Sequence, residues 1–227
     1  MAGPPGPLLF VFDFDGVIVD SHAHWLGVIR DVQREMGGTQ PIPDDVWDQL
    51  GDVSFAAMVR HLGVPGEQLL GYAARVRARM LAEVYQPPLF EGIEEVVHAL
   101  AEAGNAIILS ASPAELIQRT VHRTRLRESI DLITGGRDLR GKAAKLPPLL
   151  QRFGVRPERA VIIGDAVSDI RAGQANRMWT AAVGWGWQSA GRLREAGPDF
   201  LFERMDELLT LPERLGSGDR ISSPAPP

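Results

Sequence analysis

The sequence predicts an α/β fold, in which a parallel sheet is covered by helices on both faces and carries an all-helical insertion. Three observations support this prediction. Residues 8–12 form a continuous apolar run of strand length, as expected for a strand that is buried on both faces. Residues 21–88 then show a helical pattern without a strand. After the two prolines at 87 and 88, helices alternate with short apolar strands, which is typical of a parallel sheet.

The inserted segment begins with an amphipathic helix that Gly37 and Gly38 end. Ser54 is the predicted N-cap of a second helix, and a third helix follows Pro65. Consecutive helices without an intervening strand predict a small helical bundle. The apolar face of the first helix is formed by Trp25, Val28, Ile29, Val32 and Met36.

The remaining chain supplies the other strands of the sheet and the helices that cover them. Residues 216–227 are rich in Gly, Ser and Pro, and we expect them to form a disordered tail. We expect the strand over 180–183 to be the last strand of the sheet. The expected elements, in chain order, are a helix over 93–100 that ends at Gly104, strands over 106–109 and 131–133, a helix over 142–153, a strand over 160–163, a helix after Asp165, a strand over 180–183, and a helix over 205–211.

Composition excludes several classes of function. The 227 residues include no cysteine, which excludes disulfides, thiolate nucleophiles, Cys-ligated zinc and iron–sulfur clusters. The formal net charge of −5 offers no basic face for nucleic acid. No apolar run approaches the roughly 20 residues that a membrane helix needs, and the first residues lack the pattern of a signal peptide. We therefore expect a cytoplasmic protein with neither a nucleic-acid nor a membrane partner.

Polar residues follow three of the predicted strands. Asp13 and Asp15 follow the first strand, residues 110–112 (Ser-Ala-Ser) follow the second, and Asp165 follows the fourth, with Asp169 four residues further. Ligands of open parallel sheets bind at the carboxyl ends of the strands, so we expect these residues to converge there. Clustered carboxylates repel one another unless a cation lies among them, and oxygen-only ligands favour Mg²⁺.

Such a cluster suits phosphoryl transfer, because a hard cation neutralises charge on a phosphate group. An aspartate is ionised at neutral pH and is a usable nucleophile toward phosphorus. A second carboxyl group on the same loop can protonate the leaving oxygen. A hydroxyl group such as that of Ser110 and an ammonium such as that of Lys142 suit the phosphoryl oxygens. The chain contains only two lysines, Lys142 and Lys145.

Four segments together resemble the ordered motifs of the haloacid dehalogenase superfamily. They are Asp-Phe-Asp-Gly-Val at 13–17 followed by Asp20-Ser21, Leu-Ser-Ala-Ser at 109–112, Gly141-Lys142, and Gly-Asp-Ala-Val-Ser-Asp at 164–169. The helical insertion, with residues 89–93 and 183–186, resembles the phosphoglycolate phosphatase-like branch. The resemblance implies a Rossmann-like catalytic core over 1–20 and 89–215 and a helical cap over 21–88.

The resemblance also implies roles for the acidic residues. Asp13 is the expected nucleophile and a magnesium ligand. Asp15 is the expected general acid/base, and its backbone carbonyl is a further expected ligand of the metal. Asp165 is expected to bind the metal directly, and Asp169 directly or through water.

The phosphoryl group is expected to contact a second set of residues. By resemblance, Ser110 binds it, and Lys142 stabilises it and orients Asp13. Gly16 and Ala111 complete the expected substrate-binding set. Lys145 is the alternative to Lys142, which we favour because its interval to Gly154 and the next strand fits the family better.

The expected activity is therefore Mg²⁺-dependent hydrolysis of a small-molecule phosphate monoester through a phospho-aspartyl intermediate. Asp15 argues against carbon–halogen cleavage, because dehalogenases lack that residue. The absence of lysine between Ser21 and Pro88 argues against a phosphonatase. A sugar phosphomutase stays open as an alternative, although Trp25 stands where mutases tend to have histidine and His24 lies one place short. A non-catalytic phosphate-binding protein is a further alternative, and the oligomeric state is not predicted.

Overall fold

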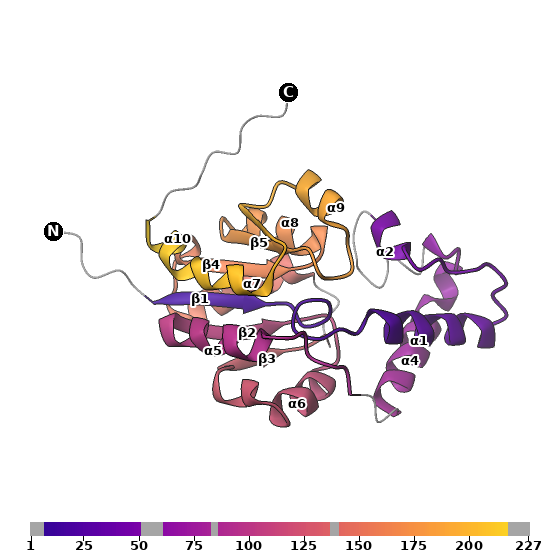
Figure 1. The fold of residues 1–227 in the computed structure, drawn as a ribbon. Helices are drawn as coiled ribbons and strands as arrows, with labels where there is room; N and C mark the ends of the chain where they lie inside the picture. Colours follow the sequence, from indigo (N-terminus) through magenta and orange to yellow (C-terminus); the bar gives the residue numbers. More distant parts are fainter. Residues whose placement is uncertain (1–6, 51–60, 83–85, 137–140, 218–227) are drawn as a thin grey trace.

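A six-stranded parallel sheet forms the centre of the protein, with a group of helices at one end (Figure 1). This computed structural model describes residues 7–50, 61–82, 86–136 and 141–217. The strand order is β3-β2-β1-β4-β5-β6, so the chain adds strands on one side of β1 and then on the other. The strands are β1 (Leu8–Phe12), β2 (Gly104–Leu109), β3 (Leu132–Thr134), β4 (Ala160–Gly164), β5 (Trp179–Val183) and β6 (Phe200–Phe202).

The sheet is buried on both faces, which explains its continuous apolar runs. Phe10 and Phe12 of β1 point to the face that carries α5 (Ile93–Ala103), α6 (Ala114–His122) and α10 (Leu211–Ser217). Leu9 and Val11 point to the opposite face, which carries α7 (Lys142–Phe153) and α8 (Val167–Ala175). Successive side chains of a strand point to opposite faces, so a strand between two helical layers must be apolar throughout. Helix α9 (Ala190–Glu195) and the 3-10 helices η2 (Arg125–Glu128), η3 (Pro157–Arg159) and η4 (Met205–Thr210) connect these elements.

The helical segment, residues 22–82, has a second hydrophobic core, to which Leu116 of α6 also contributes. It contains α1 (His22–Glu35), α2 (Val46–Gln49), η1 (Gly66–Gln68) and α4 (Leu69–Ala82). The buried Tyr72 hydroxyl group donates a hydrogen bond of 2.8 Å to the carbonyl oxygen of Ile29, which joins α4 to α1. The predicted helices after Ser21 and Pro65 are confirmed, whereas the helix predicted at Ser54 lies outside the described residues.

The two connections between the sheet and the helical segment run side by side. Asp20 N donates to Pro88 O at 2.9 Å, and Phe90 N donates to Ile18 O at 3.1 Å. Val19 and Leu89 form an antiparallel bridge between these hydrogen bonds. The helical segment therefore leaves and rejoins the sheet at one place.

The structure corrects three expectations near the carboxyl end. The strand over 180–183 is not the last one, because the three-residue strand β6 follows it. The helix expected over 205–211 is a 3-10 helix to Thr210 and continues as α10 to Ser217. Gly216 therefore belongs to a helix rather than to a tail, and residues 218–227 lie outside the described part. Helices α6 and α9 had no counterpart in the expected pattern.

None of the helices in the described ranges combines the length and the apolar character that crossing a lipid bilayer requires.

Candidate active site

Three carboxylates converge at the carboxyl ends of the two central strands. Asp13 follows β1, Asp165 follows β4, and Asp169 lies in the first turn of α8. One oxygen atom from each of the three lies within 4.8 Å of the other two. The parallel ladder between β1 and β4 continues past the strand, because Asp13 N donates to Ile163 O at 2.9 Å. Sheet register thus fixes where Asp13 stands, at the point where the strand order reverses.

Lys142 completes this cluster with a positive charge. It is the first residue of α7, and its Nζ lies 2.6 Å from Asp13 Oδ2 and also pairs with Asp169 Oδ1. Burial of the ammonium opposes its charge, but Asp13 and Asp169 outweigh burial and raise the pKa of Lys142 above its ordinary value. Lys142 therefore stays charged, and this geometry supports Lys142 over Lys145 as the lysine beside the expected nucleophile.

The cluster carries more negative charge than Lys142 can balance. Burial, together with the charges of Asp13 and Asp169, raises the pKa of Asp165 well above its ordinary value. Burial also raises the pKa of Asp169 to about 6, although Lys142 opposes this shift. Asp169 is almost completely buried, and its Oδ2 has no hydrogen-bond partner in the described part of the chain.

A divalent cation fits these three carboxylates. Its two positive charges would offset the two negative charges that remain when three carboxylates meet one ammonium. The donor atoms are all oxygen, as Mg²⁺ prefers, and the unpaired Oδ2 of Asp169 offers a ligand atom. The residues present therefore suit Mg²⁺, as the sequence predicts.

Glycine at two positions makes room for Asp165. Gly16 has a φ of +75°, and a Cβ atom there would lie 2.0 Å from Asp165 Oδ2. A Cβ atom at Gly186 would lie 2.2 Å from the Asp165 Cβ. Between them, the backbone N–H of Trp187 donates a 2.7 Å hydrogen bond to Asp165 Oδ2. Gly16 was expected in the substrate-binding set, and the structure shows that a glycine is needed there because Asp165 packs against it.

Asp15 accepts three hydrogen bonds from side chains. Its Oδ1 accepts from Ser21 Oγ at 2.7 Å and from Trp25 Nε1 at 3.0 Å, and its Oδ2 accepts from Ser112 Oγ. Burial raises the pKa of Asp15, the three donors lower it, and the charge of Asp13 raises it, with a net upward shift. A carboxyl group with a raised pKa is suited to general acid/base catalysis.

The loop after β2 brings hydroxyl groups to the same edge of the sheet. Ser110 is buried, and its Oγ accepts a hydrogen bond of 3.1 Å from Ser112 N. Ala111, the residue between them, is exposed. The contact of Ser112 with Asp15 is a finding of the structure, because the sequence shows two similar serines and does not tell which one reaches the carboxylate.

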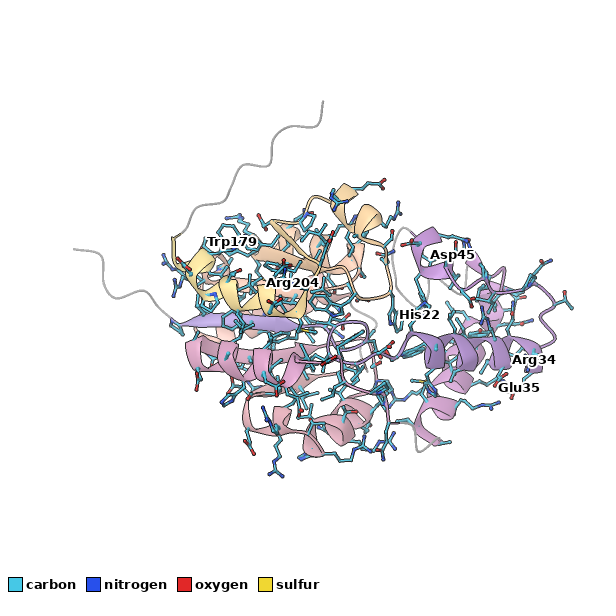
Figure 2. The ribbon with its side chains drawn as sticks, viewed as in Figure 1. His22, Arg34, Glu35, Asp45, Trp179 and Arg204 are labelled. Atoms are coloured by element: carbon cyan, nitrogen blue, oxygen red, sulfur yellow. The ribbon has the colours of Figure 1, made fainter. Side chains whose placement is uncertain are left out.

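Aromatic side chains fill the junction between this edge and the helical segment. Trp187 lies in the loop after β5, and its ring packs against the core of the helical segment. Its ring centroid lies 4.6 Å from that of Trp47 and 6.1 Å from that of Trp25. The His22 ring lies 6.0 Å from Trp187, and Figure 2 shows His22 where α1 leaves the sheet region. The neighbouring Gln188 amide donates to the carbonyl oxygens of Trp47 and, at 3.2 Å, of Leu50.

Comparison with known proteins adds independent observations. Residues 10–183 match the family model described as haloacid dehalogenase-like hydrolase. The chain is 28% identical to a phosphoglycolate phosphatase of Synechococcus elongatus over 200 residues, covering 88% of this chain and 94% of that protein. It is also 28% identical to a phosphoglycolate phosphatase of Aquifex aeolicus, covering 89% and 95%. A haloacid dehalogenase-like family hydrolase from Streptococcus pneumoniae superposes with a TM-score of 0.79 at 21% identity, covering 90% and 98% of the two chains.

Proposed function

This chain belongs to the haloacid dehalogenase-like hydrolase family and is a phosphoric monoester hydrolase, and we propose that it hydrolyses a small-molecule phosphate monoester through a phospho-aspartyl intermediate, with Mg²⁺ as cofactor. One observation carries the proposal. Asp13 stands beside a charged lysine, at a buried cluster of carboxylates, and at the ligand-binding edge of the sheet.

Asp13, Asp165 and Asp169 would hold the Mg²⁺, with the backbone carbonyl of Asp15 as a further ligand. When bound, the cation would neutralise charge on the phosphate group and on the three carboxylates. Lys142 would balance charge beside Asp13 and keep that side chain aimed at the phosphorus. The buried hydroxyl group of Ser110 would donate a hydrogen bond to a phosphoryl oxygen.

The reaction would proceed in two displacements. Asp13 Oδ attacks phosphorus, the bond from phosphorus to the ester oxygen breaks, and Asp15 gives its proton to the departing alkoxide. Asp15, now ionised, takes a proton from a water molecule whose oxygen attacks the phosphorus. The bond from phosphorus to Asp13 then breaks, so inorganic phosphate leaves and both carboxyl groups return to their starting states.

We propose that residues 21–88 act as a cap over a catalytic core formed by residues 1–20 and 89–215. The contacts of Trp187 and Gln188 with the helical segment support this division, because they join it to the core directly beside Asp165. A closed cap would exclude bulk water and select the leaving group. The two similar phosphoglycolate phosphatases favour a small phosphorylated substrate of that kind. The cytoplasmic location stays a prediction.

A panel of phosphate esters, assayed with and without Mg²⁺, tests the proposal. The wild-type enzyme should release inorganic phosphate only with the metal, and Asp13→Asn should reduce kcat by orders of magnitude because the nucleophile is lost. Asp206→Asn, a surface carboxylate paired with Arg204, is the matched control and should keep wild-type activity. Absence of phosphate release from every ester would refute hydrolysis, and faster isomerisation of a sugar phosphate would identify a mutase.

A further inference from the structure

The two regions of the protein each hold a different oxygen atom of Asp15. Ser112, in the core, donates to Oδ2. Ser21, directly before α1, and Trp25, within α1, both donate to Oδ1. Trp25 is therefore a residue of the helical segment that touches the expected acid/base of the core through an indole N–H, 3.0 Å from the carboxylate.

We propose that Trp25 is a positioning residue for Asp15, and that its indole N–H holds the carboxyl group in the orientation that presents Oδ2 to the leaving group. This inference rests on the proposed phosphatase activity. It assigns a role to a position that the sequence marks as an aromatic residue on the apolar face of a helix, where mutases tend to have histidine.

The chemistry of the donors explains why Trp25 differs from the two serines. A hydroxyl group can donate or accept a hydrogen bond, so Ser21 and Ser112 can accompany Asp15 in either protonation state. An indole N–H can only donate. As long as Trp25 binds Oδ1, that oxygen acts as an acceptor, and Oδ2 is the oxygen that is left to face the leaving group.

Ring packing against Trp187 holds the Trp25 indole in position. The Trp25 ring meets the Trp187 ring edge to face, with 6.1 Å between centroids and an interplanar angle of 64°. The backbone N–H of Trp187 in turn donates to Asp165. Trp25 thus connects two carboxylates of the site through one ring contact and two hydrogen bonds. A displacement of the helical segment at α1 would carry the Oδ1 donor with it.

Leaving-group dependence distinguishes a positioning role from simple packing. An alkyl phosphate needs a proton for its departing oxygen, whereas a nitrophenyl phosphate does not, because nitrophenolate is a stable leaving group. In Trp25→Phe, kcat/KM for an alkyl phosphate should fall about 10-fold or more, the scale expected when a general acid is misaligned. For nitrophenyl phosphate it should change by less than about 3-fold, since the general acid contributes little there.

Trp47→Phe provides the matched control. Trp47 also lies in the helical segment and contacts Trp187, but its Nε1 has no hydrogen-bond partner among the described residues. Any loss in this variant should be the same for both esters, because only packing changes. An equal loss for both esters in Trp25→Phe would overturn the positioning role while leaving the phosphatase proposal intact. A wild-type enzyme that hydrolyses neither ester would overturn both.

A second readout does not depend on activity. The five tryptophans give five indole ¹H–¹⁵N resonances, and the one that Trp25→Phe removes belongs to Trp25. Asp15→Asn should move that resonance more than the other four, because the carboxylate acceptor becomes a neutral amide. A Trp25 resonance that stays in place in Asp15→Asn would show that the hydrogen bond does not exist in solution and would overturn the inference.

Discussion

The two sides of the candidate site are built in different ways. On the sheet side, charged groups stand where strand register puts them, and Lys142 pairs directly with both Asp13 and Asp169. On the helical side, the described groups that reach the site are neutral donors and aromatic rings, chiefly Ser21 and Trp25. The difference suggests that reaction chemistry resides in the sheet, and that the helices govern the orientation of one carboxyl group.

Substitution of Lys142 is the most direct test of whether the sheet side holds the reactive charges. Lys142→Ala should lower kcat/KM about 100- to 1000-fold, because a preorganised charge beside the nucleophile is lost. Lys145→Ala, one turn along the same helix, should stay within about 2-fold of wild type. Comparable losses in the two variants, measured as phosphate release, would contradict the assignment.

Gly16→Ala should lower the activity almost as much as Lys142→Ala, for a steric reason. A Cβ atom at this position meets Asp165 Oδ2 at 2.0 Å and also requires a left-handed backbone conformation. Gly37→Ala imposes the same kind of backbone strain at a φ of +81°, and among the described residues no atom beyond its chain neighbours lies within 4 Å of the added Cβ. Both variants should lose about 1 kcal/mol of stability to strain. Only Gly16→Ala should lose Mg²⁺-dependent activity, and retention of that activity would show that Asp165 is not confined there.

The excess charge of the sheet side predicts a pH-dependent response to Mg²⁺. Burial raises the pKa of Asp169 to about 6 and raises that of Asp165 well above its ordinary value, so both retain protons in the folded metal-free state when the unfolded chain has lost them. The metal-free protein therefore loses stability as pH rises from about 4 through 6, because the folded state binds more protons there. Mg²⁺ requires ionised ligands, so the increase in Tm that it causes should be larger at pH 7.5 than at pH 5.

Calorimetry with and without Mg²⁺ checks this expectation, and Asp169→Asn supplies the control. The substitution removes one titrating ligand, so the Mg²⁺-induced increase in Tm should become smaller at pH 7.5. An increase in Tm that is the same at both pH values in the wild-type protein would contradict a carboxylate site for the metal.

Gln188, at the junction between the two sides, should show the smallest catalytic effect and a clear effect on stability. Gln188 accepts from Val167 N at 2.7 Å and donates to the carbonyl oxygens of Trp47 and Leu50. Gln188→Ala leaves these buried groups without partners, which should cost about 1–3 kcal/mol of unfolding free energy. Gln174→Ala removes an exposed amide that also binds two carbonyl oxygens, and should cost less than about 1 kcal/mol. Equal costs in urea unfolding would argue against a buried junction at Gln188.

The sequence predicts the sheet side far better than the helical side. Asp13 and Asp165 each follow an apolar run that reads unambiguously as a buried strand, and parallel strands bring their carboxyl ends together. The strand β6 was missed and β3 was predicted one residue out of place, because a strand of three residues is too short to show periodicity. Helical periodicity places Trp25 on an apolar face, but it does not tell that the indole N–H lies at a carboxylate 10 residues earlier in the chain. That contact depends on how α1 leaves the sheet.

The doubled connection beside Val19 and Leu89 has a consequence for the architecture as a whole. Hydrogen bonds from the Asp20 and Phe90 amides join the outgoing and returning backbones, so the chain passes between the sheet and the helices at one two-stranded connection. This connection lies within a few residues of Asp15 and Ser21 in the sequence. Any change of conformation at this connection would therefore occur beside the carboxyl group that is the expected acid/base.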